Sequence, residues 1–439
     1  MGSELRNEND DVVWGMSLGA VLRQARFGHV LTRLALPPDG ADDGIRPGGP
    51  LQAPARIPLL SAVEPYRHLT ETLGRIAVRE EAVLAIGYDW RRSIEHAANA
   101  LQPVVLDHLD RWKARFASLP DDERRGLPEP QLTFVCHSMG GLVARWLTEV
   151  SGLRPHVRRI ITLGTPFAGS LNAVRVLATG DYLPFGLFAR SLRESARTMP
   201  GLYELVARYE SVRDGGALRA IQPADLASVD ASDVLADAAF QVHRRLANAV
   251  AAAGNNACPM VTLVGTNQPT AQTVRFADGT AEFFEDRDGT DHRGDGTVYR
   301  YAASLKGGNP MPLPQSHGAL AKTPEAAAFV EATLTERDLA EVQAGDAPGL
   351  RAPEAVAVNQ PFEVEALPTH GTDVGAVTCR VVDTSTNAPI NIAAFRHPAG
   401  TSSFVTTLAL PQPGVYRLLL AGSGYSPVEH LVVAMADAP

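Results

Sequence analysis

The sequence contains little cysteine, no long apolar run and no excess of basic residues. Its three cysteines, Cys136, Cys258 and Cys379, are too few for a disulfide framework in a chain of 439 residues. No run of about 18 consecutive apolar residues is present, which argues against a membrane-spanning helix. The formal net charge of −9 gives no electrostatic footprint for nucleic acid, so we expect no nucleic-acid partner.

The amino end is polar and does not have the pattern of a signal peptide. A myristoylation signal after Met1 and Gly2 needs serine or threonine at the sixth position, which Arg6 occupies. We therefore expect a cytoplasmic protein, and this expectation lapses if the natural start lies upstream. The hydrophobic content of 45% is ample for a buried core, and the length suits two domains, or three with an inserted cap.

The most informative feature present is a serine between a strand pattern and a helix pattern. Leu132 to Cys136 is a short apolar, β-type run, and a paired glycine follows Ser138 and opens an apolar helical stretch. This layout predicts a nucleophile elbow, a sharp turn that lifts the serine hydroxyl clear of a sheet. The helix amino terminus behind Ser138 would place N–H groups where an oxyanion forms, beginning with the amide of Met139. A plain strand-to-helix connection is the alternative interpretation.

An acid and a histidine follow the serine in the order that serine hydrolases of this type require. Asp295 lies between two glycines, which allow a tight turn, and His317 lies in a polar loop bounded by glycine. A helix follows with Thr323 as its N-cap. We predict Ser138 as the nucleophile, His317 as the base and Asp295 as the group that orients the histidine.

The loop before Asp295 is acidic, and this leaves a second interpretation open. It carries Glu285, Asp286, Asp288 and Asp291, with His292 beside them. Such a loop is either solvated or a site for a cation such as calcium. We favour the triad role for Asp295, and we expect no metal and no cofactor.

Strand and helix patterns alternate through the middle of the chain and then stop. Ala82 to Ile86 reads as a strand, a helical pattern runs from Ile94 to Leu109, and a further strand begins at Ile160; this alternation favours a mostly parallel sheet. Residues from about 168 to 256 read as several helices, the expected place for a cap. An apolar cluster within them is either the core of the cap or a lipid-facing lid; its members are Tyr182, Leu183, Phe185, Leu187 and Phe188.

The composition changes again after a helix that runs from Thr323 to about Val342. Residues 344–359 are rich in glycine, alanine and proline and read as a linker. Five short alternating segments follow, separated by turn clusters, which is the pattern of a β-sandwich. They begin at Phe362, Ala376, Ser403, Val415 and Val428. No chemistry is recognisable in this part, and its protein partner, if it has one, is not indicated.

Two further motifs narrow the class of protein. Ile86 to Arg91 contains a tyrosine-aspartate-tryptophan-arginine tetrad, and Ile160 to Ser170 contains leucine-glycine-threonine-proline. Together with the serine, aspartate and histidine motifs, they make residues 1 to about 335 resemble the lecithin:cholesterol acyltransferase family, which includes lysosomal-type phospholipase A. The tetrad is the most specific of these motifs.

This resemblance implies an α/β-hydrolase fold and acyl transfer from a lipid ester through an acyl-serine. The expected division is an α/β-hydrolase domain over 1–343 with its cap at about 168–256, the linker at 344–359, and an immunoglobulin-like sandwich over 360–439. The resemblance also suggests transient contact with a membrane surface. The residues that it assigns to substrate binding are Tyr88, Asp89, Trp90, Thr165 and Phe167, and Trp14 is either part of the acyl site or packing.

The resemblance exposes a departure at the amino end. Family members open with an apolar strand and a proline-glycine turn, and Met1 to Leu5 resembles the end of that turn, so the first core strand is expected to be missing. By the resemblance, the Met1 position supplies the second oxyanion N–H beside Met139. Three functions stay open: an esterase or acyltransferase for lipids, an esterase for soluble esters, and a catalytically crippled relative that acts as a binding or scaffold protein.

Overall fold

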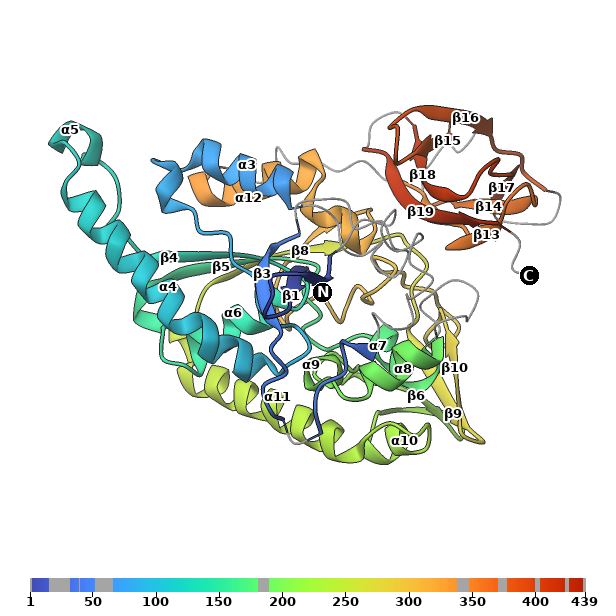
Figure 1. Ribbon diagram of the computed structural model, residues 1–439, viewed down its shortest axis with the longest axis horizontal. Coiled ribbons are helices and arrows are strands. Elements are labelled where there is room, and N and C mark those ends of the chain that lie inside the picture. Colours follow the sequence, from blue (N-terminus) through green and yellow to red (C-terminus); the bar gives the residue numbers. More distant parts are fainter. Residues whose placement is uncertain are drawn as a thin grey trace.

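The computed structural model describes residues 2–15, 32–38, 40–51, 66–180, 189–337, 347–369, 377–398, 403–422 and 426–436. At its centre lies a parallel sheet, seen nearly edge-on in Figure 1. Its strands, in spatial order, are β11 (Met311–Leu313), β8 (Met260–Gly265), β5 (Val157–Leu163) and β4 (Leu132–His137). Strands of parallel sheets are buried on both faces, and all four residues from Ile160 to Leu163 of β5 are accordingly buried. The prediction of a parallel sheet is confirmed.

Helices cover both faces of this sheet (Figure 1). On one face lie α4 (Ile94–Ala117), α6 (Gly140–Glu149) and α11 (Asp233–Ala253), and on the other lie α3 (Arg67–Ile76) and α12 (Pro324–Thr335). The Ser93 side chain caps α4 by accepting from the His96 amide, and Thr323 caps α12 by accepting from Ala326. The short α5 (Asp121–Arg124) follows α4.

The segment predicted as a strand over Ala82 to Ile86 belongs to no sheet. It begins in a 3-10 turn, Glu80–Ala82, and then continues as extended backbone without a ladder partner among the described residues. Near it lies a small antiparallel sheet of β2 (Val12–Trp14), β1 (Ser3–Arg6) and β3 (Arg46–Pro50). The prediction of local extended conformation was right, but the prediction of sheet membership was wrong.

The region predicted as a helical cap is a mixture of helices and strands. Its helices are α7 (Leu171–Ala178), α8 (Ala189–Ala196), α9 (Pro200–Tyr203) and α10 (Pro223–Ala227). Strands β6 (Glu210–Asp214), β7 (Ala217–Ala220), β9 (Thr273–Ala277) and β10 (Thr280–Phe284) form a sheet in the order β10-β9-β6-β7. Two tight turns with positive φ build its hairpins, at Gly215 with Gly216 and at Asp278 with Gly279. The apolar cluster predicted at Tyr182 to Phe188 lies outside the described residues.

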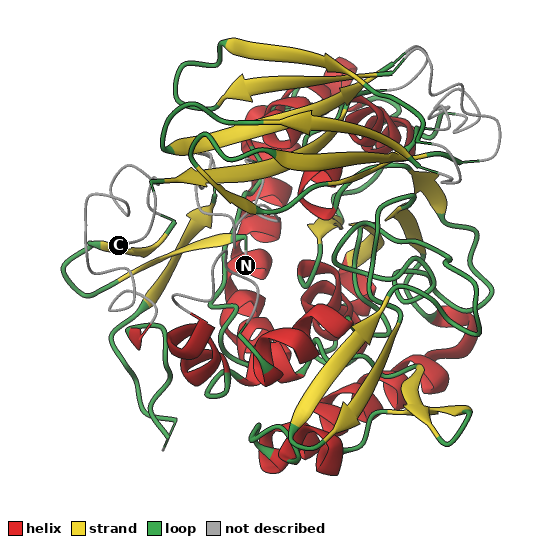
Figure 2. Cartoon of the chain, turned by 90° about the vertical axis from the view of Figure 1, so that its right-hand side faces the viewer, coloured by secondary structure: helices red, strands yellow, loops and turns green. Residues whose placement is uncertain are grey.

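The carboxyl-terminal part is an all-β sandwich, seen as two stacked layers in Figure 2. One sheet has the order β12 (Gly349–Arg351), β14 (Phe362–Leu367), β17 (Phe404–Leu408). The other has the order β13 (Ala355–Ala357), β19 (Val428–Met435), β18 (Gly414–Ala421), β15 (Thr378–Asp383), β16 (Pro389–Ala394). Strands β12 and β13 occupy the stretch that the composition indicated as a linker. They pair with β14 and β19, so the sandwich begins earlier than predicted.

The sandwich contacts the segment that carries His317. Gln315 donates from Nε2 to the carbonyl oxygen of Pro427 at 2.8 Å, and Lys322 forms a 2.7 Å ion pair with Glu429. Both residues lie within five positions of the histidine. None of the helices in the described ranges has the length and apolar character needed to cross a membrane.

Candidate active site

Ser138 lies on a sharp turn between β4 and α6. Its φ of 54° is in the left-handed region, which costs a non-glycine residue roughly 1–2 kcal/mol. Two hydrogen bonds hold this conformation: the Ser138 amide donates to the Leu163 carbonyl at 3.0 Å, and Thr165 Oγ1 donates to the Ser138 carbonyl at 2.8 Å. A Cβ on Gly141 would lie 2.2 Å from Thr165 Oγ1, so the paired glycine lets strand and helix approach.

Ser138, His317 and Asp295 form one hydrogen-bonded array. His317 Nε2 lies 2.9 Å from Ser138 Oγ, and His317 Nδ1 lies 2.7 Å from Asp295 Oδ2. The other carboxylate oxygen accepts from the amides of Thr297 and Val298 at 2.9 and 2.6 Å. With a carboxylate at Nδ1, the imidazole carries its hydrogen there and leaves Nε2 free to accept the serine proton.

The glycines at the ends of β5 and β8 make room for this array. A Cβ on Gly265 would lie 2.3 Å from the Asp295 Cβ. A Cβ on Gly164, whose φ is +63°, would lie 3.2 Å from both Asp295 Oδ2 and His317 Nδ1. The aspartate and histidine are 1% and 4% exposed, so the pair is shielded from water. A shielded pair keeps its electrostatic interaction strong.

A second histidine positions the first, and sequence reasoning missed it. His137 Nε2 lies 2.9 Å from the His317 carbonyl oxygen, and the Tyr66 hydroxyl lies 2.8 Å from His137 Nδ1. The carbonyl can only accept, so Nε2 carries the hydrogen and Tyr66 donates to Nδ1. Burial, together with the neighbouring His317, holds the pKa of His137 well below its usual range. The one sequence feature that could have indicated this role is that His137 directly precedes Ser138.

The amide of Met139, the residue predicted to donate to the oxyanion, directly follows the serine. None of the described residues accepts a hydrogen bond from it. It lies at the amino end of α6, where unpaired N–H groups and the positive end of the helix dipole favour an anion. Met1, the predicted second donor, lies outside the described residues.

The acidic loop before Asp295 is neutralised by arginines. Asp286 pairs with Arg213 at 2.7 Å, and Asp291 pairs with Arg293 at 2.8 Å. Hydrogen bonding to Arg213 lowers the pKa of Asp286 from its ordinary value. Over the described ranges, no group of three or more histidine, cysteine or acidic side chains is arranged to hold a metal ion.

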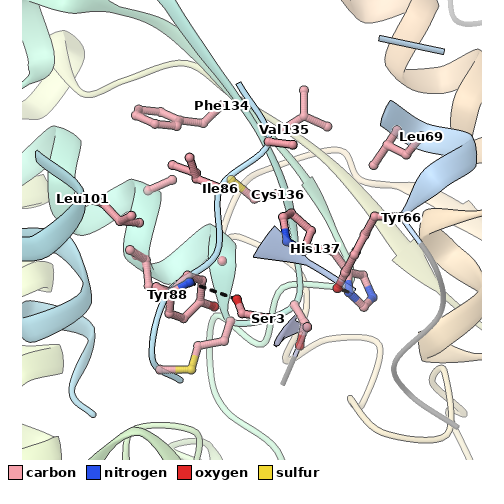
Figure 3. A pocket seen from close by; sticks show the side chains of 18 of the residues that line it. Ser3, Tyr66, Leu69, Ile86, Tyr88, Leu101, Phe134, Val135, Cys136 and His137 are labelled. Atoms are coloured by element: carbon pink, nitrogen blue, oxygen red, sulfur yellow. Dashed lines mark hydrogen bonds between the residues drawn. The ribbon is translucent and has the colours of Figure 1, made fainter. Parts of the chain in front are cut away.

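A cavity of about 590 Å³ opens at Ser138 and His317 and extends along β4 (Figure 3). Tyr88 lines it, as expected for a substrate-binding residue. Thr165 does not line it, because its side chain is buried and bonds the turn of Ser138. Phe167 lies outside the lining as well, with Arg145 over its ring at 5.8 Å.

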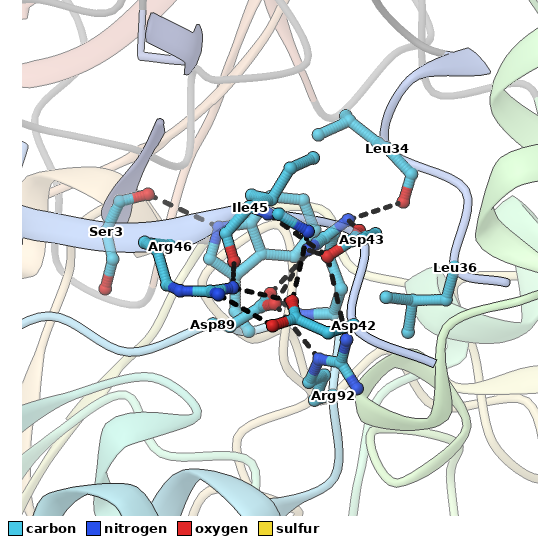
Figure 4. A network of polar contacts seen from close by, with 12 residues as sticks. Ser3, Leu34, Leu36, Asp42, Asp43, Ile45, Arg46, Asp89 and Arg92 are labelled. Atoms are coloured by element: carbon cyan, nitrogen blue, oxygen red, sulfur yellow. Dashed lines mark hydrogen bonds and ion pairs between the residues drawn. The ribbon is translucent and has the colours of Figure 1, made fainter. Parts of the chain in front are cut away.

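The remaining predicted substrate residues form a buried scaffold. The side chain of Asp89 binds Arg91, which also binds Asp43; Figure 4 shows Asp89 and Asp43 within this polar network. The rings of Trp90 and Trp14 pack with centroids 5.0 Å apart, at 4% and 3% exposure. The tyrosine-aspartate-tryptophan-arginine tetrad therefore anchors residues 42–46 against the start of α4. Its Asp89 and Trp90 do not line the cavity.

Comparisons with known proteins are consistent with this arrangement over part of the chain. Residues 58–216 match the family model described as lecithin:cholesterol acyltransferase. No curated protein matches the chain.

Among solved structures, the Bacillus licheniformis lipase BlEst2 in its propeptide form is similar at 14% identity, over 77% of this chain and 64% of that chain, with a TM-score of 0.32. Its mature form is similar at 14% identity over 56% of this chain and 76% of that chain, with a TM-score of 0.29. A superoxide reductase (neelaredoxin) from Ignicoccus hospitalis is similar at 18% identity over 20% of this chain and 80% of that chain, with a TM-score of 0.16. TM-scores this low carry no argument about fold or function.

The family match covers the part of the chain that builds the turn of Ser138. It extends from just before α3, through β4, α6 and β5, into the cap as far as β6. These elements contain the tetrad and the serine and proline motifs that carried the resemblance. Over residues 58–216 the chain is thus similar to the lecithin:cholesterol acyltransferase family.

Proposed function

We propose that this protein cleaves or transfers the acyl group of a lipid ester through an acyl-serine formed on Ser138. The observation that carries the proposal is the array of Ser138, His317 and Asp295 at 2.9 and 2.7 Å, with the serine on a strained turn. The left-handed backbone of Ser138 costs stability, and strain of this kind is concentrated at active sites. Its place next to a buried histidine–aspartate pair therefore favours a catalytic serine.

The array supports a two-step acyl transfer. Ser138 Oγ attacks the ester carbonyl carbon while His317 Nε2 takes the hydroxyl proton, and the carbonyl oxygen becomes an oxyanion near the Met139 amide. The tetrahedral intermediate then expels the alcohol, which receives the proton from His317. Water or a second alcohol, deprotonated by His317, attacks the acyl-serine carbonyl carbon. The second tetrahedral intermediate expels Ser138 Oγ, which takes the proton back from His317, and the acid or the new ester leaves. Asp295 stabilises the imidazolium in both steps.

The lipid class rests on the family match and on the wall of the cavity that faces Ser138 from the cap. The cap side of this cavity is mostly apolar, with Ser170 and Asn172 as its polar members; its apolar residues are Ala173, Val176, Leu192, Leu202 and Leu205. Apolar side chains around an acyl site favour long aliphatic acids, since each buried methylene contributes about 0.8 kcal/mol. An esterase for short, soluble esters would use less of this apolar surface.

Activity of Ser138→Ala tests the proposal. With p-nitrophenyl esters of increasing acyl length, we expect wild-type kcat/KM to rise with chain length and Ser138→Ala to lose turnover, with Ser151→Ala as a matched control outside the cavity. A fluorophosphonate probe should label the wild type and the control, but not Ser138→Ala. Undiminished turnover in Ser138→Ala would refute the acyl-serine, and a preference for acetyl esters would favour a soluble substrate.

A further inference from the structure

A second cavity, of about 380 Å³, lies beside the segment that follows Asp295. Its described lining consists of aromatic rings, two alanines and one arginine; the rings and the arginine belong to Tyr209, His292, Tyr299, Tyr301 and Arg287. The cavity at Ser138 shares none of these described residues, but its lining includes Val298, the neighbour of Tyr299. The volume is in the range of small-molecule sites, about 300–1,000 Å³. The segment after Asp295 therefore borders two cavities, and the second is large enough for a ligand.

Four aromatic rings meet at this second cavity. The ring centroid of Tyr299 lies 5.3 Å from that of Tyr209, 5.4 Å from that of Tyr301 and 6.3 Å from that of His292. The angles between the ring planes are 46°, 83° and 53°, so none of these rings is stacked flat on Tyr299. Tyr299 is 5% exposed and Tyr301 is 55% exposed. The rings therefore form angled walls that extend from the interior to the surface.

The polar ends of these rings have no protein partner in the described part of the chain. No hydrogen bond joins the hydroxyls of the three tyrosines, or the ring nitrogens of His292, to another described residue. The Tyr209 hydroxyl is also buried, and buried polar atoms in folded proteins nearly always have a hydrogen-bond partner. Burial raises the pKa of Tyr299 to about 12 and also raises that of Tyr209, so both phenols are protonated at neutral pH. Several hydrogen-bonding groups at one cavity are thus left for a ligand to pair.

The charge of the wall disfavours an ionic ligand. Arg287 is the one formally charged side chain in the described lining, and Glu210 neutralises it. The guanidinium donates to the Glu210 carbonyl oxygen and lies 3.2 Å from a carboxylate oxygen of the same residue. A cation would lie near Arg287 without a carboxylate in the described lining, and an anion would compete with Glu210 for the arginine. An uncharged ligand avoids both costs.

We propose that this cavity binds a sugar ring. A pyranose has apolar C–H faces that pack against aromatic walls, and a rim of hydroxyls that donate to and accept from the tyrosine hydroxyls and His292. Water alone would pair the hydroxyls but would not cover the rings, and an aliphatic chain would cover the rings but leave the hydroxyls unpaired. A quaternary ammonium group, which suits aromatic walls, also makes no hydrogen bonds. The proposal does not depend on the chemistry of Ser138.

Isothermal titration calorimetry of the full chain with the methyl glycosides of glucose, galactose and mannose tests the proposal. We expect at least one to bind with a Kd on the order of 1 mM, ordinary for a ligand of this size. Tyr301→Ala should weaken this binding tenfold or more, and Tyr301→Phe, which keeps the ring, should weaken it less. Tyr301 is exposed, so both variants should fold, and thermal unfolding checks this. The matched control is Ile392→Ala, which shortens a 61% exposed side chain on β16 and should bind as the wild type does.

A sugar ring is also present on glycolipid head groups, and a second measurement separates the two sources. Vesicles of phosphatidylcholine with and without glucosylceramide or galactosylceramide are sedimented with the protein. Retention that needs the glycolipid and is lost in Tyr301→Ala, without binding of the free glycosides, would assign the cavity to a lipid-borne sugar.

Three outcomes would overturn the proposal. The first is that neither the free glycosides nor the glycolipid vesicles bind. The second is sugar binding that Tyr301→Ala leaves unchanged, because the sugar would then occupy another place. The third is binding of tetramethylammonium or inorganic phosphate, lost in Tyr301→Ala, in place of any sugar, which would show a site for an ion.

Discussion

Gly164 lies directly under the contact between Asp295 and His317, so replacing it tests whether that contact drives turnover. In Gly164→Ala, the new Cβ would lie 3.2 Å from Asp295 Oδ2 and from His317 Nδ1, and 2.7 Å from Leu320 Cδ1. The end of the leucine side chain can turn away. The carboxylate and imidazole are fixed by hydrogen bonds and must move by a few tenths of an ångström or more.

The cost has two parts. Alanine at a φ of +63° costs about 1–2 kcal/mol of stability, and overpacking adds about 1–3 kcal/mol. A domain with about 5–15 kcal/mol of stability stays folded at assay temperature. Displacement of the base by up to an ångström lowers kcat by about 10². We therefore expect a folded protein with kcat reduced about a hundredfold and KM nearly unchanged.

Gly152→Ala is the matched control. Gly152 also has a positive φ, of 81°, but open space surrounds the position of its Cβ. It should lose the same 1–2 kcal/mol from the backbone and keep kcat. Thermal unfolding and hydrolysis of a p-nitrophenyl ester measure both quantities. If Gly164→Ala folds and retains kcat within twofold of Gly152→Ala, the histidine–aspartate contact does not limit turnover and our assignment of the pair is mistaken.

Three further predictions follow from individual contacts. Asp295→Asn should lower kcat about 10⁴-fold by favouring the wrong histidine tautomer, while Asp291→Asn should be mild; the reverse order would move the acid to Asp291. Thr165→Val should reduce stability by about 1–3 kcal/mol and kcat with it, because the turn carbonyl loses its donor; a rise in KM alone would instead indicate substrate contact. Burial raises the pKa of Glu204 from 4.5 to about 8, so the folded state keeps a proton that the unfolded state loses. The free energy of unfolding should therefore fall as pH rises from about 4.5 to 8, by up to about 1.4 kcal/mol per pH unit. Melting temperatures measured across this range should show most of that slope lost in Glu204→Gln. Equal slopes in both proteins would contradict a buried, neutral carboxyl.

The elements around Ser138 could be predicted because local chemistry decides them. The apolar run into a serine and two glycines specifies strand, turn and helix, and the N-caps Ser93 and Thr323 fix the starts of α4 and α12. The order of acid and histidine along the chain was visible in the same way, and the structure brings these two residues to the serine. Their catalytic role stays a prediction until the variants are measured.

What could not be predicted depends on neighbours far apart in the sequence. Whether residues 83–88 join a sheet depends on what lies beside β4, which no local pattern reports. Thr165 and Asp89 belong to motifs that predicted substrate-binding residues. In the structure their side chains instead bond the Ser138 carbonyl and Arg91, and so they support the fold around the site. The hairpin turn at Gly215 and Gly216 lies in the stretch that was predicted to be helical, so the strands on both sides of it were missed.

The same polypeptide segment carries His317 and the contacts of the sandwich. Gln315 and Lys322, which bind Pro427 and Glu429, flank the histidine on both sides. The position of the base is therefore thermodynamically linked to the docking of a domain that contains no triad residue. A molecule that binds the sandwich more tightly in one docked position than in another can shift the population of active histidine by at most that difference in binding free energy. A substrate that selects one histidine position must, in turn, change the affinity of the sandwich for that molecule.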